Sequence, residues 1–145
     1  MGRGPTTRPG TERAAIEFVA GPTVLVVDDE PVIRAWVARV LTLAGMDVAV
    51  AAGGREALRL VADGRVQPAV VLTDIEMPGM TGIELAARLL ALRPGVRIVM
   101  MTGDPARAQA ARGHPSIVDE VVLKPARAED LVQAVRPAVD PTPVA

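Results

Sequence analysis

The sequence predicts a doubly wound α/β domain, in which a five-stranded parallel sheet carries helices on both faces. Short apolar runs rich in β-branched residues alternate with longer segments of helical period. Several of these runs are apolar almost throughout, which is typical of strands that are covered on both faces. We find no internal repeat, and strands that alternate with helices at this spacing are joined by right-handed crossovers.

Five segments have the composition of buried strands. They are residues 23–27, 47–51, 69–73, 96–101 and 120–123. The first, third and fourth are apolar nearly throughout, which favours a parallel sheet over an antiparallel one.

Five further segments have a helical period and recognisable ends. They are residues 31–44, 55–62, 81–92, 105–112 and about 128–135. Pro31 stands at a first-turn position, and Thr81 with Glu84 can form a capping box. Glu129 and Asp130 suit the first turn of the last helix, which we expect Pro137 to stop.

The length of 145 residues and the 50% content of hydrophobic residues suit one domain with a single core. Residues 1–21, which begin with a run rich in Gly, Pro, Thr and Arg, are expected to form a flexible tail. We expect the domain to span residues 22–139 and a C-terminal tail to span residues 140–145.

Composition excludes several classes of function. The chain has no cysteine, which excludes disulfides and Cys-based metal sites. The net charge is only -1, with no one-sided basic footprint, so we do not expect nucleic acid as a direct partner. No apolar run approaches the roughly 20 residues of a membrane span, and residues 1–21 do not have the apolar stretch that we would expect of a secretory signal. We therefore expect a cytoplasmic protein.

Polar residues follow four of the predicted strands: Asp28 and Asp29, then Asp74, then Thr102, then Lys124. In a parallel sheet these ends meet at one edge. Three carboxylates brought together repel one another unless a cation binds or protons are taken up. Oxygen ligands without His or Cys select a hard divalent ion such as Mg²⁺.

The same residues can support phosphoryl transfer. A carboxylate can attack phosphorus once nearby cations neutralise the phosphoryl oxygens, and Asp74, alone at its strand end, is the best candidate. Lys124 can supply a point charge and Thr102 a hydroxyl donor. Each motif taken alone is also an ordinary turn, and it is their joint order at strand ends that favours function.

The chain resembles the response-regulator receiver domains of two-component signalling. The resemblance rests on four segments: Val24-Leu-Val-Val-Asp-Asp-Glu-Pro31, Leu72-Thr-Asp-Ile-Glu-Met-Pro-Gly79, Met101-Thr-Gly103 and Leu123-Lys-Pro125. It implies a flavodoxin-like fold with strand order 2-1-3-4-5.

The resemblance also implies roles for individual residues. Asp74 would be the phosphoacceptor, and Asp28, Asp29, Asp74 and the Glu76 backbone carbonyl would bind Mg²⁺. Thr102 and Lys124 would be the switch hydroxyl and the phosphate-binding lysine, with a cis Lys124–Pro125 bond. The chain would take phosphate from a histidine kinase or phosphotransfer protein and act on an unknown downstream protein, as a monomer or weak dimer. Apart from transfer to and from itself, it would not be an enzyme.

The chain departs from the family pattern near the lysine. The position three before Lys124, usually aromatic, is Val121, and Ala126 stands where relatives often have Phe. Glu76 and Asp104 occupy positions that in relatives border the path of the water that attacks the aspartyl phosphate. We therefore expect an altered phosphoryl lifetime. Helix breakers stand at both ends of residues 105–112, so we also expect that helix to be short or mobile.

Two alternatives remain open at this point. The first is a non-switching binding module that keeps the fold, which the loss of the aromatic residue at Val121 would allow. The second is a magnesium-dependent phosphohydrolase, for which Glu76 lies two residues after Asp74, although the chain has no room for a cap. His114, the only histidine, is expected on the surface rather than in a catalytic role.

Overall fold

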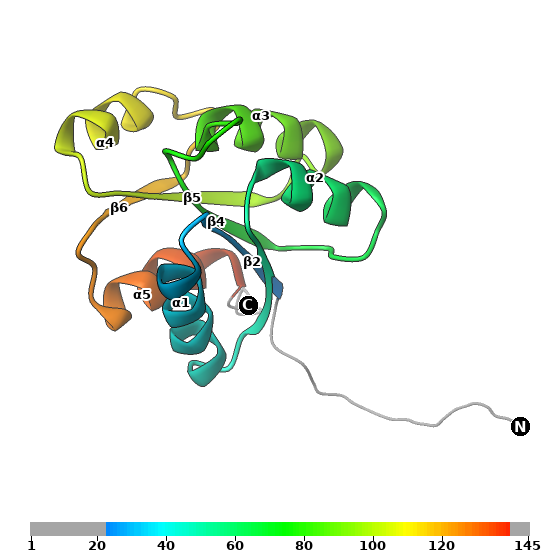
Figure 1. Cartoon of the computed structure of the whole chain (residues 1–145), viewed down its shortest axis with the longest axis horizontal. Helices are drawn as coiled ribbons and strands as arrows, with labels where there is room; N and C mark the ends of the chain where they lie inside the picture. Colours follow the sequence, from blue (N-terminus) through cyan, green and yellow to red (C-terminus); the bar gives the residue numbers. More distant parts are fainter. Residues whose placement is uncertain (1–22, 140–145) are drawn as a thin grey trace, which may run out of the picture.

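The computed structural model describes residues 23–139, which form five parallel strands and five helices (Figure 1). The strands are β2 (Thr23–Val27), β3 (Asp47–Ala51), β4 (Val70–Asp74), β5 (Arg97–Thr102) and β6 (Glu120–Leu123). They lie in the order β3-β2-β4-β5-β6. Numbered along the chain, this is the order 2-1-3-4-5, which confirms the predicted flavodoxin-like topology.

The helices cover both faces of the sheet. They are α1 (Pro31–Leu43), α2 (Gly54–Ala62), α3 (Gly82–Leu92), α4 (Pro105–Arg112) and α5 (Ala128–Val139). Helices α1 and α5 lie on one face, and α2, α3 and α4 lie on the other (Figure 1). The sheet is therefore doubly wound, as the alternation of strands and helices predicts.

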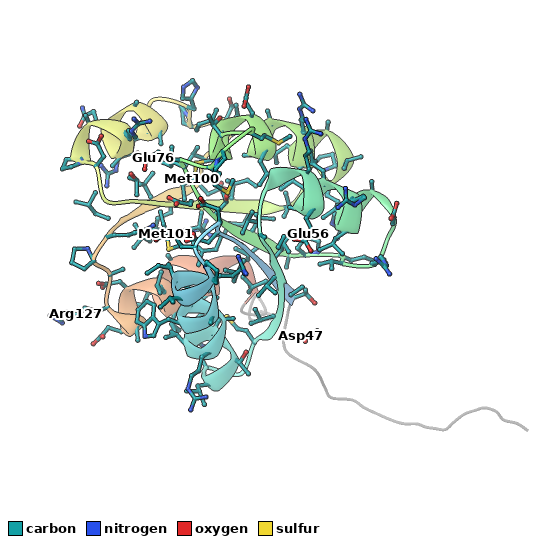
Figure 2. All side chains as sticks on the ribbon, viewed as in Figure 1. Asp47, Glu56, Glu76, Met100, Met101 and Arg127 are labelled. Carbon is teal, nitrogen blue, oxygen red and sulfur yellow. The ribbon has the colours of Figure 1, made fainter. Side chains whose placement is uncertain are left out.

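The core has two halves because successive side chains of a strand point to opposite faces of the sheet. Leu25 and Met100 pack under α2, α3 and α4, whereas Val26 and Met101 pack under α1 and α5. Met100 and Met101, labelled in Figure 2, are 0% and 2% exposed, so both are core residues. Every residue of β4 is buried, as expected for a central strand covered on both faces.

Capping residues mark the starts of two helices where the sequence predicts them. Thr81 caps α3 through a reciprocal capping box, in which Glu84 N donates to Thr81 Oγ1 at 3.2 Å and Thr81 N donates to Glu84 Oε1 at 3.0 Å. Asp104 caps α4 by accepting from Ala106 N at 2.9 Å. Helix α4 has only eight residues, so the expectation of a short fourth helix is confirmed, while its mobility stays a prediction.

The end of the last helix differs from the prediction. The sequence predicts that α5 stops near Val135, before Pro137, but the helix continues to Val139. A proline within a helix removes the hydrogen bond to the carbonyl four residues earlier and its ring crowds that carbonyl, which here belongs to Gln133 in the last turns of the helix. Gln133 lies on the exposed surface, where water can replace that donor, so a proline in the last turn is tolerated.

Other boundaries shift by a single residue, and two of these shifts matter. Strand β4 ends at Asp74 and β5 at Thr102, so both predicted site residues are the last residues of their strands. The predicted tails at residues 1–21 and 140–145 lie outside the described residues. Within residues 23–139, no helix has both the length and the apolar character needed to cross a membrane.

Candidate functional site

The carboxyl ends of four neighbouring strands bring the predicted site residues to one edge of the sheet. Asp28 and Asp29 follow β2, Asp74 ends β4, Thr102 ends β5 and Lys124 follows β6. The register pairs Asp74 with Met101 and Thr102 with Leu123 across adjacent strands. Topology alone therefore gathers residues that lie far apart in the sequence.

Three of these residues form an acidic cluster, which we define as Asp28, Asp29 and Asp74. One carboxylate oxygen from each lies within 4.8 Å of the others. Asp28 is 0% and Asp74 6% exposed, whereas Asp29 lies on the surface. Two buried negative charges at this separation are unfavourable unless a cation offsets them.

Local hydrogen bonds fix the position of Asp28. Its amide donates to Ala51 O on the neighbouring strand at 3.2 Å, and its carbonyl accepts from Arg34 Nη1 at 2.7 Å. Its Oδ1 accepts from Glu30 N at 2.9 Å. The remaining oxygen, Oδ2, is buried and has no hydrogen-bond partner.

The position of Asp74 depends on a close approach of α3 to the end of β4. Gly82 N donates to Ile75 O at 2.8 Å. A Cβ on Gly82 would collide with Asp74 O and would lie 3.0 Å from Ile75 Cα. Because both of those atoms belong to the backbone, only glycine fits here without moving the strand end.

Two buried oxygens of the acidic cluster have no hydrogen-bond partner, namely Asp28 Oδ2 and Asp74 Oδ1. Lys124 Nζ is the nearby cation, at 3.9 Å from Asp28 Oδ2 and 3.5 Å from Asp74 Oδ2. Burial raises the pKa of both carboxyls above their ordinary values, and the charge of Lys124 only partly opposes this. The acidic cluster therefore holds more negative charge than Lys124 alone offsets, and its oxygen-only ligands fit a hard divalent ion.

The Thr102 hydroxyl lies beside Glu76 and Asp104. It accepts from Asp104 N at 3.1 Å and lies 3.5 Å from Glu76 Oε2. Thr102 is fully buried, whereas the Glu76 side chain reaches outward toward α4 (Figure 2). The side chain of Glu76, and not only its backbone carbonyl, is thus part of the site.

Sequence reasoning missed three contributors to the site: Arg34, Gly82 and Arg107. Arg34 holds the Asp28 carbonyl, and Gly82 admits α3 to the end of β4. Arg107 contacts Glu76 Oε2 and also Asp104 Oδ2, three residues before it on α4. The three-residue spacing of Asp104 and Arg107 is the one feature of the sequence that predicts a contact of Arg107. It predicts the pair with Asp104 and not the contact with Glu76.

The departures from the family pattern leave apolar surface near Lys124. Val121 is half-buried and packs against the core under α2, α3 and α4. A mainly apolar pocket lies on the α1 side, and its lining is Ile33, Trp36, Val37, Met101, Lys124, Pro125 and Ala126. The Lys124–Pro125 bond in its wall is cis, as the resemblance implies. His114 is exposed in the loop after α4, as expected.

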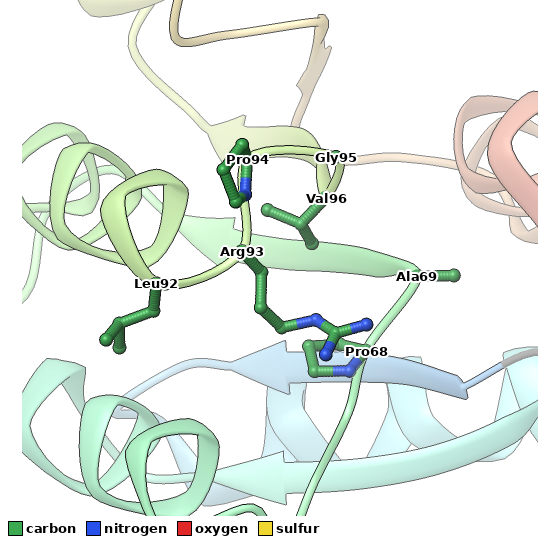
Figure 3. Close-up of a pocket in the computed structure, with 7 residues that line it drawn as sticks. All are labelled: Pro68, Ala69, Leu92, Arg93, Pro94, Gly95 and Val96. Carbon is green, nitrogen blue, oxygen red and sulfur yellow. The ribbon is translucent and has the colours of Figure 1, made fainter.

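A second pocket lies at the other end of the sheet, where β4 and β5 begin (Figure 3). Its lining is Pro68, Ala69, Leu92, Arg93, Pro94, Gly95 and Val96. Arg93 is the one charged residue in that lining, which contains no acid to hold a cation. The pocket is therefore separate from the acidic cluster.

Comparison with known proteins agrees with this architecture. The family model described as the response regulator receiver domain matches residues 24–136. The DNA-binding response regulator MtrA of Mycolicibacterium smegmatis is 38% identical over 113 residues, or 78% of this chain and 48% of MtrA. The transcriptional regulatory protein TcrA of Mycobacterium tuberculosis is 37% identical over 118 residues, or 81% of this chain and 46% of TcrA. The chain thus spans about half the length of these curated relatives.

Solved structures give the same result. The chemotaxis protein CheY4 of Vibrio cholerae superimposes with a TM-score of 0.71 at 31% identity, covering 83% of this chain and all of that one. A receiver domain protein from Clostridium thermocellum gives a TM-score of 0.75 at 27% identity, covering 82% and 94%. With the fold, the strand-end residues and the matched range in agreement, the chain belongs to the response regulator receiver domain family of two-component signalling.

Proposed function

We propose that the chain accepts a phosphoryl group on Asp74 and that this event switches its contact with a downstream protein. The observation that carries the proposal is the acidic cluster beside Lys124, with two buried oxygens that lack hydrogen-bond partners. A module that never bound a cation or a phosphoryl group would have no use for so unfavourable an arrangement. Family membership supports the same function.

Asp28, Asp29, Asp74 and the backbone carbonyl of Glu76 are the residues that we propose as Mg²⁺ ligands. The exposed Asp29 suits a ligand that acts through water, whereas the buried Asp28 suits direct contact. When bound, the ion would supply positive charge for the phosphoryl oxygens.

In the proposed reaction, a carboxylate oxygen of Asp74 attacks the phosphorus of a phosphohistidine on the donor. The P–N bond breaks, the acyl phosphate P–O bond forms, and the imidazole leaves as a neutral ring that keeps the proton already on its other nitrogen. Lys124, 3.5 Å from Asp74, binds a phosphoryl oxygen. The Thr102 hydroxyl, at the end of the adjacent strand, donates to another. Hydrolysis of the acyl phosphate later restores Asp74.

We propose that the donor, a histidine kinase or phosphotransfer protein, docks on the apolar surface of α1. Val32 is 78% and Trp36 43% exposed, although both are large and apolar. Trp36 also lines the pocket that reaches Lys124, so a protein seated there would place a phosphohistidine near Asp74. This role suits a cytoplasmic monomer or weak dimer with a protein target and no direct contact with nucleic acid.

The experiment is intact mass after incubation with Mg²⁺ and acetyl phosphate, beside an Asp74→Asn variant. We expect one added phosphoryl group that requires both Mg²⁺ and Asp74. An Asp28→Asn variant should lose most of the uptake, because one ligand to the ion becomes neutral. No added mass in the wild-type protein, with no binding of beryllofluoride, would instead support the non-switching module.

A further inference from the structure

Three charged side chains form a cluster between the β4–α3 loop and helix α4. Arg107 Nε contacts Glu76 Oε2 at 2.5 Å and lies 3.3 Å from Asp104 Oδ2. All three side chains are substantially exposed, at 58% for Arg107, 41% for Glu76 and 46% for Asp104. Exposed ion pairs contribute little to stability, so the fold does not depend on this cluster.

Glu76 connects these three charged side chains to the acidic site. Glu76 lies two residues after Asp74, and its Oε2, the atom that contacts Arg107, also lies 3.5 Å from the Thr102 hydroxyl. Thr102 ends the strand next to Asp74, so the Glu76 carboxylate adds a negative charge to the same edge of the sheet as the residue that would be phosphorylated.

A phosphoryl donor brings further negative charge to this edge of the sheet. A phosphoryl group carries about 1.5 to 2 negative charges near neutral pH. It would approach a site that already holds Asp28, Asp29 and Asp74. An uncompensated carboxylate at Glu76 would repel it, and a cation in contact with that carboxylate reduces the repulsion.

We propose that Arg107 is a positioning residue that holds the Glu76 side chain and offsets its charge, so that an anionic phosphoryl donor can reach Asp74. The inference rests on the proposed function and adds a residue to it. Arg107 itself needs to touch neither Asp74 nor the donor. It acts through Glu76, and its location on α4 links that helix to the site.

The test compares the rates of phosphorylation by acetyl phosphate with Mg²⁺, followed by intact mass. We expect Arg107→Gln to slow phosphorylation about five-fold at low ionic strength. The uncompensated Glu76 carboxylate would then repel the anionic donor as it approaches Asp74. The loss should shrink as salt is added, because exposed charges are screened. Arg107→Lys, which keeps the charge, should recover most of the rate.

A double-mutant cycle separates this role from a general effect on α4. With Glu76→Gln in place, Arg107 still contacts Asp104 but no longer has the Glu76 carboxylate to offset, so adding Arg107→Gln should change the rate less than about two-fold. Arg112→Gln is the matched control, since it removes the same charge from the last turn of the same helix. We expect it to leave the rate unchanged.

The outcomes distinguish the inference from the function on which it rests. If the wild-type protein takes up no phosphoryl group, the proposed function fails and the inference falls with it. If the wild-type protein is phosphorylated and Arg107→Gln reacts at the same rate, only the inference is overturned. The inference is also wrong if Arg107→Gln slows the reaction equally in the Glu76→Gln background, because the effect would not pass through Glu76.

Discussion

At the scale of single residues, Asp28 and Asp74 combine burial with negative charge. Burial raises the pKa of each carboxyl, so the folded state binds protons more tightly than the unfolded state does. Below the ordinary pKa of about 3.9, the carboxyls are protonated in both the folded and the unfolded state, so folding buries no negative charge. As the pH rises through the raised pKa, the folded protein must hold these charges, and its stability falls.

We therefore predict that Asp74→Asn stabilises the metal-free protein near neutral pH, by on the order of 1 kcal/mol. The gain should vanish at a pH below the ordinary pKa of the carboxyl, where it is protonated in both states. Urea unfolding at the two pH values in the presence of a chelator measures this difference. A variant less stable than wild type at neutral pH would mean that the contact with Lys124 outweighs the cost of burial.

Gly82 permits the close contact between α3 and the end of β4. Gly82→Ala would drive a Cβ into Asp74 O, so we predict a loss of about 1–3 kcal/mol in the free energy of unfolding. Gly95→Ala is the control, because a Cβ there meets nothing within 4 Å. Both are measured by denaturant unfolding, and equal effects of the two changes would show that the close approach at Gly82 is not what costs stability.

At the scale of secondary-structure elements, α1 carries large apolar side chains that remain exposed in the folded chain. We predict that Trp36→Ala weakens phosphotransfer from a cognate histidine kinase or phosphotransfer protein at least about ten-fold, since exposed aromatic anchors dominate docking. Phosphorylation by acetyl phosphate should change little, because a small donor needs no docking surface. Equal loss with both donors would indicate damage to the site itself, and Leu43→Ala tests the far end of the same helix.

The elements are largely predictable from the sequence because their signals are local. The capping box of Thr81 and Glu84 and the apolar runs of the strands depend on neighbours a few residues away. The prediction is wrong at Pro137, where the rule that proline ends a helix ignores its place in the last turn of α5. Helix α4 is correctly predicted to be short, since Pro105 and Gly113 bound it.

At the scale of the whole molecule, the acidic cluster should couple metal binding to folding. A ligand that binds only the folded state stabilises it in proportion to the logarithm of its concentration. We predict that Mg²⁺ raises the midpoint of thermal unfolding at neutral pH, and that a chelator reverses the rise. The rise should be lost in Asp28→Asn, and a rise of the same size in that variant would show that the ion binds elsewhere.

Local patterns in the chain establish the order of strands and helices and the residues at the strand ends. In a parallel doubly wound sheet those ends meet at one edge, so the sequence alone assigns Asp28, Asp74, Thr102 and Lys124 to one site. What those residues touch is settled by packing. Arg107 contacts Glu76, and Gly82 lies against Asp74. Neither contact can be predicted from the positions of these residues in the sequence. Which buried oxygens remain without partners depends on the same packing, because burial and hydrogen bonding are properties of the folded chain.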